Sequence, residues 1–390
     1  MPIRIYSSNR VEKLQHSLCY ELTSQPLTNP LAGDVILVPT FAMSRWLNLR
    51  FAQQRGVAAN IEYPLPAAWL WQIAEQVIGD IPARDPLAAE PMTWKIFSML
   101  PVLTDKAEFT DLSQYLMDDD SGIKRWQLSV RIAEVFDRYQ HYRPDMIDNW
   151  SNAKASDWQA ILWQALIEDL HGQHRVDIIS SIIDHLGSSN PGVNLPERIS
   201  LFAISGLPPL TLEVLSALSY HIEICFYLHS PSDQYIADLK SSRSLAKLGL
   251  SRPDEVKYYD SGNELLASWG NQAKTMQSHF LQQDYLVAQE TESYWPPGNS
   301  RLLQSIQQNI FALGATPINT QVDDSISIHV CHSAMRECQV LYDQLLKILS
   351  DNPQLNAEDV LVMVPEISRY APYIEAVFGY GDNTDRPYLA

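Results

Sequence analysis

The sequence has no phosphate-binding loop. No Gly-Lys dipeptide occurs anywhere in its 390 residues. Residues 2–6 predict a short β-strand and residues 10–21 a helix, and the turn between them reads Ser7-Ser8-Asn9-Arg10. Enzymes of the P-loop class place Gly-x-x-x-x-Gly-Lys-Ser/Thr in such a turn, because phosphate needs bare backbone N–H groups and a reaching lysine. We therefore do not expect this strand and helix to hold a nucleotide for hydrolysis.

Cysteine is scarce as well. The chain has four cysteines, Cys19, Cys225, Cys331 and Cys338, and no Cys-x-x-Cys pair. Four scattered thiols in a chain of this length exclude a disulfide framework and argue against a zinc ribbon or an iron–sulfur cluster. We expect buried free thiols in a reducing compartment, and no bound cofactor.

Long apolar runs are also missing. No stretch approaches the roughly 18 consecutive apolar residues of a membrane span. Residues 1–4 (Met-Pro-Ile-Arg) do not begin a secretory leader or a transit peptide. We therefore expect a cytoplasmic protein with no membrane partner.

The chain has fewer basic than acidic residues, and the excess of negative charge is distributed unevenly along the sequence. The net charge is −18, yet the basic and acidic side chains of residues 1–80 cancel, so the whole excess lies after residue 80. Such a chain has no general positive field that would bind DNA nonspecifically. If DNA is a ligand, it is held locally, with help from other subunits.

The pattern of residues 1–80 predicts an α/β fold with a parallel sheet. Short aliphatic runs alternate with amphipathic stretches, which is typical of βαβα units. Thr40 is well placed to cap the second helix. The expected strands are 2–6 and 34–38, and the expected helices are 10–21, 41–55 and 66–78.

From residue 85 to 197 the pattern is helical only, which predicts an all-α insertion in the first α/β domain. Leu128, Ile132, Val135, Tyr139 and Tyr142 recur at helical spacing and predict one buried stripe. Strand patterns return at 198–206 and 221–228. We therefore assign residues 1–84 and 198–318 to the first domain.

A boundary is expected near residues 315–324, and residues 322–390 are expected to begin a second α/β lobe. Its predicted strands are 325–333 and 359–365, and its predicted helices are 337–349 and 370–378. Two βα units are too few for an independent lobe. We therefore expect the chain, which ends at Pro387-Tyr388-Leu389-Ala390, to be part of a longer protein.

No segment predicts a catalytic or metal site. Asp254, Glu255 and Lys257 are the residue types of a metal-dependent nuclease, but they are adjacent in a polar loop and cannot converge on one ion. His171 and His174 have helical spacing for a metal, yet no further ligand is obvious, so we interpret them as solvent-facing residues at a helix end.

Two tryptophans suggest a stacking surface. Trp69 and Trp71 follow the rigid Tyr63-Pro64-Leu65-Pro66 turn and point to different faces of one helix. One of them should therefore be exposed, and an exposed indole can stack on an unpaired base. Burial remains the better account of most other aromatic residues.

Six motifs, in order along the whole chain, resemble the RecC family, a subunit of the bacterial exonuclease V or RecBCD helicase–nuclease. They are Tyr6-Ser-Ser-Asn9-Arg10, Val57-Ala-Ala-Asn60-Ile61-Glu-Tyr-Pro64-Leu65-Pro66, Tyr142-Arg143-Pro144-Asp145, Ile204-Ser-Gly206-Leu-Pro208-Pro209, Leu265-Leu-Ala-Ser-Trp269-Gly270 and Ile328-His-Val-Cys-His332-Ser333. The match covers the N-terminal third or so of that subunit.

The resemblance implies a degenerate superfamily 1 helicase fold whose ATPase site has been lost. It implies a subunit that neither hydrolyses ATP nor cuts DNA, and that forms a heterotrimer with RecB-like and RecD-like motors. It also implies contact with DNA ends and with single-stranded DNA, since the family threads the 3′ strand through a tunnel whose wall scans for the recombination hotspot Chi.

By matching position, the resemblance assigns tunnel-wall roles to ten residues. They are Pro39, Phe41, Arg45, Leu65, Trp71, Glu134, Val135, Asp137, Arg143 and, with a looser alignment, Arg175. In physical terms, the helix start at Thr40 offers N–H groups to phosphate. Arg45 and Arg143 can pair with phosphate or a guanine edge, Glu134 or Asp137 can accept from an amine, and Trp71 can stack.

The chain departs from the family in the first turn. The family has side-chain amides and a hydroxyl where this chain has Pro39, Phe41 and Arg45, which implies a different or weaker hotspot sequence. Two alternatives stay open. One is a pure scaffold that docks the motors without touching DNA, and the other is an AddB-type subunit, whose cluster cysteines and nuclease motif would lie beyond residue 390.

Overall fold

The structure is a computed structural model that describes residues 3–79, 81–82, 84–152, 157–170, 174–187, 195–282, 287–314, 318, 321 and 323–379. It divides into two units. The first comprises Met1–Asn299 and Gln304–Ile318, and the second comprises Ser300–Leu303 and Asn319–Ala390. The expected chain end at residues 387–390 lies outside the described residues.

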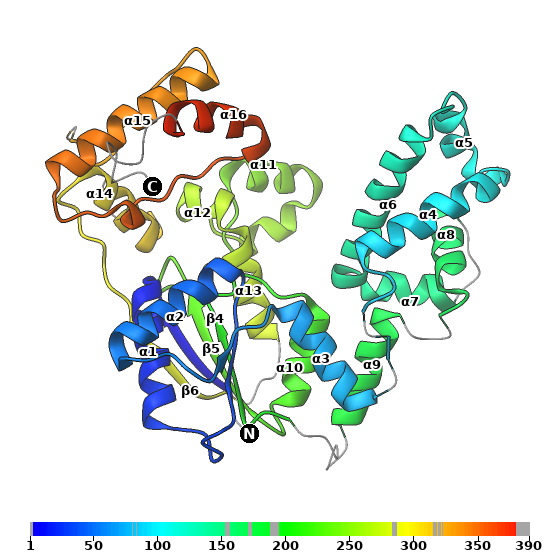
Figure 1. Cartoon of the computed structure of the whole chain (residues 1–390), viewed down its shortest axis with the longest axis horizontal. Coiled ribbons are helices and arrows are strands. Elements are labelled where there is room, and N and C mark those ends of the chain that lie inside the picture. The colour runs from blue at the N-terminus through cyan, green and yellow to red at the C-terminus, as the bar shows by residue number, and fades with distance from the viewer. Residues whose placement is uncertain are drawn as a thin grey trace. The chain divides into compact units, whose positions relative to one another are not determined.

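A six-stranded sheet forms the centre of the first unit (Figure 1). All its neighbouring strands pair in parallel, in the order β3-β2-β4-β5-β1-β6. The parallel α/β fold predicted from the sequence is therefore confirmed. The strands are β1 (Ile3–Ser8), β2 (Asp34–Leu37), β3 (Ile61–Glu62), β4 (Arg198–Phe202), β5 (Glu223–His229) and β6 (Val287–Glu292).

Alternation along the strands gives the sheet two buried faces. Ile36 and Val38 belong to a cluster with α1 (Val11–Ser24) and α2 (Phe41–Arg55), whereas Leu37 belongs to the cluster on the opposite face. Helices on both faces explain why the central strands β4 and β5 are buried along most of their length. The second face is covered by α3 (Pro66–Ile78), α9 (Arg175–Leu186) and α10 (Pro209–Leu218).

The helix ends follow from local chemistry. The Thr40 hydroxyl accepts a hydrogen bond from the Met43 N–H at 3.2 Å, so the predicted cap of α2 is confirmed. Gly56 ends that helix with a φ of 81°, a value that glycine tolerates without strain. Pro66 is the first residue of α3, where its missing N–H has no helical partner in any case.

Every described element from residue 89 to residue 186 is a helix. They are α4 (Ala89–Leu103), η1 (Ala107–Phe109), α5 (Thr110–Leu116), α6 (Ile123–Tyr142), α7 (Pro144–Asn152), α8 (Trp158–Ile167) and α9. Buried Phe136 and Trp163 of this region belong to the same hydrophobic cluster as Ile199 and Ile224 of the sheet. The hydrophobic core is therefore continuous between these helices and the sheet. The prediction that the helices form a separate inserted domain stays a prediction.

The buried stripe of α6 differs from the predicted one. Tyr142 is 60% exposed, and Leu128, Val135 and Tyr139 are only half-buried. The buried side chains of α6 are Ser129, Ile132, Ala133, Phe136 and Gln140. The stripe is rotated because Phe136 packs against Trp150 and Trp163, with ring centroids 5.7 and 6.1 Å away.

The rest of the first unit holds further helices. They are α11 (Ser242–Ser251), η2 (Pro253–Tyr258), α12 (Glu264–Trp269), α13 (Asn271–Gln282) and most of α14 (Leu302–Phe311). The sequence predicts no strand at β6, because this segment is polar and does not alternate. None of the described helices is long and apolar enough to cross a membrane.

The second unit contains α15 (Ala334–Asp351), η3 (Ala357–Asp359) and α16 (Ile367–Phe378). Both helices were expected, but the strands predicted for 325–333 and 359–365 are wrong, since the described residues of this unit contain no strand. Their apolar side chains are open to solvent, with Ile328, Val330, Leu361 and Met363 each more than 80% exposed. An apolar run becomes a strand only when another segment takes up its backbone hydrogen bonds.

The four cysteines are free. Cys19, Cys225 and Cys338 are buried, as predicted, whereas Cys331 is partly exposed. Burial raises the pKa of the Cys225 thiol to about 12. This thiol therefore stays protonated and unreactive at neutral pH.

Candidate nucleic-acid interface

A cavity of about 240 Å³ opens where four helices of the first unit meet the sheet. Its walls come from the turns after β2 and β3, from α3, α6 and α9, and from the start of α10 with the turn before it. The ends of parallel strands are the usual place for a ligand crevice in open α/β sheets. The lining residues are mostly apolar: Pro39, Leu65, Pro66, Ala67, Leu70, Trp71, Ala74, Gln140, His141, Arg175, Ile178, Ile179, Ile182, Gly206, Leu207, Pro208, Leu210 and Thr211.

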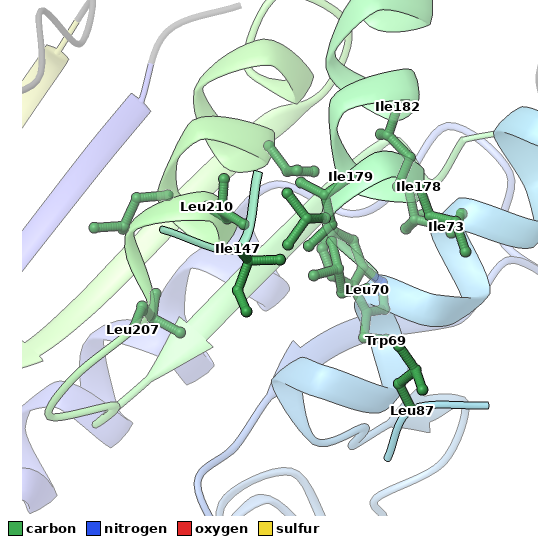
Figure 2. Packing of buried hydrophobic residues seen from close by; sticks show 14 of the residues in the cluster. Trp69, Leu70, Ile73, Leu87, Ile147, Ile178, Ile179, Ile182, Leu207 and Leu210 are labelled. Atoms are coloured by element: carbon green, nitrogen blue, oxygen red, sulfur yellow. The ribbon is translucent and has the colours of Figure 1, made fainter. Parts of the chain in front are cut away.

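The spacing of residues along the helices determines which apolar side chains form the wall of the cavity. Figure 2 shows Leu70 and Ile73 of α3 beside Ile178 and Ile179 of α9, with Leu210 of α10 close to them. Residues three and four apart share a helix face, so α3 and α9 each present one aliphatic stripe to the other. The wall is therefore part of the hydrophobic core and holds its shape without a ligand.

Four of the residues assigned by resemblance line this cavity. They are Pro39, Leu65, Trp71 and Arg175. Trp71 is half-buried, and its indole N–H donates to the Pro82 carbonyl at 2.9 Å, which fixes the ring. Trp69 is only 4% exposed. Neither indole is exposed, so the expectation that one of them would be is wrong: both belong to the packing of α3, and Trp71 is the more accessible of the two. Its stacking on a base stays a prediction.

Arg175 is already paired. Its guanidinium lies 2.5 Å from Asp85 Oδ2 and 3.8 Å from Asp137 Oδ1. Asp85, in turn, accepts from the Leu87 N–H at 2.9 Å. Two carboxylates therefore balance this cation, which is only 14% exposed. The sequence did not indicate Asp85, because its partner lies 90 positions away in a segment with no recognisable pattern.

His141 completes this polar chain as a neutral ring. Burial, and next the charge of Arg175, lower its pKa below the ordinary value. Its Nδ1–H donates to the Asp137 carbonyl at 2.7 Å, and its Nε2 faces the Arg175 guanidinium. This arrangement assigns the proton to Nδ1 and leaves Nε2 to accept from Arg175.

The remaining assigned residues lie outside the cavity lining. Phe41 is 73% exposed in the first turn of α2. Arg45, one turn further, is exposed and has no hydrogen bond or ion pair within the part of the chain that the structure describes. Val135 packs against the core. The hydroxyl of Thr40, next to Pro39 in the chain, caps α2 by accepting from the Met43 N–H.

On α6 and after it, two assigned charges face solvent. Glu134 forms an exposed ion pair with Arg131 at 3.1 Å. The Arg143 side chain is 58% exposed and lies 3.7 Å from Asp145. Exposed pairs of this kind contribute little to stability, so both side chains remain available to a ligand.

A distant segment bridges the end of β1 and the turn after it; Ser7 and Ser8, which the sequence predicted in the turn, are the last residues of the strand. Ser8 Oγ donates to the Ser293 carbonyl at 2.6 Å, and the Asn9 side chain bonds both backbone groups of Trp295. The Lys13 ammonium lies 4.3 Å from the Trp295 ring centroid. The polar side chains of this turn therefore hold protein backbone.

His174 corrects one expectation. Its side chain is buried, lies 2.8 Å from Asp177 and packs on Trp163, so the solvent-facing interpretation is wrong. It caps α9, whose first turn includes Asp177. His171 lies outside the described residues. Within the described ranges, no group of three or more His, Cys, Asp or Glu side chains could hold a metal ion.

Known proteins of one family are similar to this chain. The family model described as RecC, N-terminal domain, matches residues 3–313. The RecBCD enzyme subunit RecC of Escherichia coli strain K12 is 35% identical over 97% of this chain and 38% of its own length. The subunit of the same name from Haemophilus influenzae is 29% identical over 99% of the chain and 40% of its length, and that of Mycolicibacterium smegmatis 30% over 99% and 35%. The chain thus spans about two fifths of these relatives.

Proposed function

Because this chain belongs to the RecC family, we propose that it is the non-catalytic, DNA-contacting part of a RecBCD-type helicase–nuclease. It would act in double-strand-break repair and recombination, as a subunit beside RecB-like and RecD-like motors. In this proposal its first unit is a degenerate helicase-like domain that guides the 3′ strand and scans it for a hotspot.

The contacts of the turn after β1 support the proposal that this unit does not hydrolyse a nucleotide. A phosphate loop needs free backbone N–H groups around the phosphates. Here Ser8 and Asn9 hold the backbone of residues 293–295, and the Lys13 ammonium lies over the Trp295 ring. No side chain of this turn takes the place of the P-loop lysine.

The chemistry of the cavity carries the proposal. Its walls are apolar and rigid, and Trp71 offers an aromatic surface beside them. Arg175 is the one ionised side chain among the described residues of the lining, and Asp85 and Asp137 neutralise it. A phosphate would find no net positive charge there. A flat, uncharged group such as a nucleobase suits this cavity better.

The strand backbone would then lie outside the cavity. Arg45 follows Pro39 on the exposed start of α2, and Arg143 ends α6, the helix that supplies Gln140 and His141 to the lining. Both guanidinium groups are open to solvent, and the N-terminus of α2 adds partial positive charge. This arrangement suits local contacts to phosphate in a chain whose net charge is −18.

The test uses the full complex, assembled with its motor subunits. In the Arg45→Glu/Arg143→Glu double variant, affinity for single-stranded DNA should fall, and the salt dependence of binding should lose about 0.7 in log–log slope for each phosphate contact removed. Arg243→Glu/Arg252→Glu makes the same charge change on exposed residues of α11 and the residue that follows it. That control should bind as the wild type does.

Two outcomes would separate the alternatives. If both double variants bind DNA and respond to the hotspot as the wild type does, the chain is a scaffold and the proposal fails. If both lose affinity equally, only the total charge matters, and a local contact at Arg45 and Arg143 is excluded.

A further inference from the structure

Gln140 is a polar residue in an apolar place. It lies on the buried face of α6, one turn beyond Phe136, and its side chain is 0% exposed. It also belongs to the lining of the 240 Å³ cavity. Glutamine is rarely buried completely unless its amide is satisfied by hydrogen bonds.

Half of this amide is satisfied. Gln140 Nε2 donates to the Leu87 carbonyl at 3.1 Å, which fixes the orientation of the group. Gln140 Oε1 is buried and accepts no hydrogen bond from any residue that the structure describes. Since an unpaired buried acceptor is costly, such an oxygen calls for a partner that the protein itself does not supply.

Two polar groups of the cavity lining, His141 and Arg175, are already engaged elsewhere. The N–H of His141 goes to the Asp137 carbonyl, and Arg175 is engaged by Asp85, Asp137 and His141. The aliphatic side chains around them offer no donor. Gln140 Oε1 is thus a buried acceptor without a partner, on a residue that lines the cavity.

We propose that Gln140 is a specificity-determining residue, whose Oε1 accepts a hydrogen bond from the exocyclic amine of a base seated in the cavity. This inference rests on the proposed function, because it presumes that single-stranded DNA reaches the cavity. A single fixed acceptor favours bases that carry an amine over bases that present a carbonyl at the same place. A site built around a buried acceptor rejects analogues that leave the acceptor unpaired.

The probes are oligo-dC and oligo-dU of equal length, which share ring size and differ at position 4, an amine in dC and a carbonyl in dU, and in the hydrogen on N3. For the assembled wild-type complex we expect Kd to be roughly tenfold lower for oligo-dC, the ratio that one ordinary hydrogen bond gives. In Gln140→Met the acceptor is gone and the side-chain length is kept. The dC-to-dU ratio should fall towards one.

Gln127→Met is the matched control, because Gln127 is an exposed glutamine on the same helix. It should keep the wild-type ratio. A second measurement needs no variant: wild-type complex with oligo-dC dimethylated at N4, which has no amine hydrogen to donate, should lose roughly tenfold in affinity. This measurement decides the matter if Gln140→Met fails to assemble.

A wild-type ratio near one, or a ratio that Gln140→Met leaves unchanged, would overturn the inference while DNA binding itself stands. The inference is equally overturned if dimethylated and plain oligo-dC bind alike. If the wild-type complex binds none of these strands, the proposed function fails first and the inference with it. The two failures are therefore distinct in the data.

Discussion

Asn9 holds the backbone of Trp295 with both ends of its side-chain amide. Nδ2 donates to the Trp295 carbonyl at 2.7 Å, and Oδ1 accepts from the Trp295 N–H at 3.0 Å, across 286 positions of sequence. The contact joins the first strand-to-helix turn to the segment that follows β6. The two hydrogen bonds resemble those between paired strands, and they continue the pairing of β1 with β6 past the ends of both strands.

Asn9→Ala should therefore destabilise the first unit. Two hydrogen bonds are lost, but both are open to water, so we expect a loss of about 1 kcal/mol in the free energy of unfolding. Urea titration measures this loss, and hydrogen exchange at the Trp295 amide should quicken. Asn48→Ala removes an exposed asparagine of α2 that has no partner among the described residues, and it should change little. Equal effects of both substitutions would contradict this role of Asn9.

The Arg175–Asp85 pair should be strongly coupled. Both side chains are largely buried, and Arg175→Met leaves the Asp85 carboxylate without its partner. Breaking a buried pair from one side costs about 3 kcal/mol, whereas Arg175→Met/Asp85→Asn removes both charges and should recover much of that loss.

A double-mutant cycle followed by urea unfolding gives the coupling energy. The exposed Arg252–Glu255 pair, with an N–O distance of 3.2 Å, is the control and should give a coupling of about 0.5 kcal/mol. If the two effects in the buried pair simply add, Arg175 does not depend on Asp85. It would then be free to serve as the DNA contact that the family resemblance assigns.

Local chemistry was enough to predict the first helices. The bounds of α2 and α3 agree with the sequence, because Thr40 caps one helix and Pro66 begins the other. Regular spacing and end signals act within a few residues, so they are visible without tertiary structure. The same holds for β2, whereas β1 runs two residues past its predicted end, to Ser8, because polar Ser7 and Ser8 give no strand signal.

The rest of the site depends on contacts between distant segments. The predicted stripe of α6 counted apolar residues only, and the true buried face includes Gln140, which no hydrophobic pattern selects. Asp85 and the bridge from Asn9 to Trp295 are likewise invisible until the chain is folded. In the second unit, apolar runs predicted strands that have no partner strand among the described residues.

His141 should give the first unit a stability that falls in mild acid. Its pKa in the folded chain is lowered, first by burial and then by Arg175, whereas in the unfolded chain it should be near 6.5. Between the folded value and 6.5 the unfolded chain binds more protons, so the free energy of unfolding rises with pH in that window. The contribution is complete above pH 6.5 and is lost as the pH falls through the folded pKa. One proton allows a slope of at most about 1.4 kcal/mol per pH unit.

His141→Gln removes this titration and keeps a neutral polar side chain. Urea unfolding from pH 5 to 8 should show the wild type losing stability faster than the variant below pH 6.5, with parallel curves above it. His16→Gln, on an exposed face of α1, is the control and should follow the wild type throughout. The wild type and His141→Gln share every other titrating group, so the difference between their two curves isolates His141. A wild-type advantage that grows as the pH falls would mean that Asp137 and Asp85 outweigh burial and Arg175, and that the ring is charged beside the cavity.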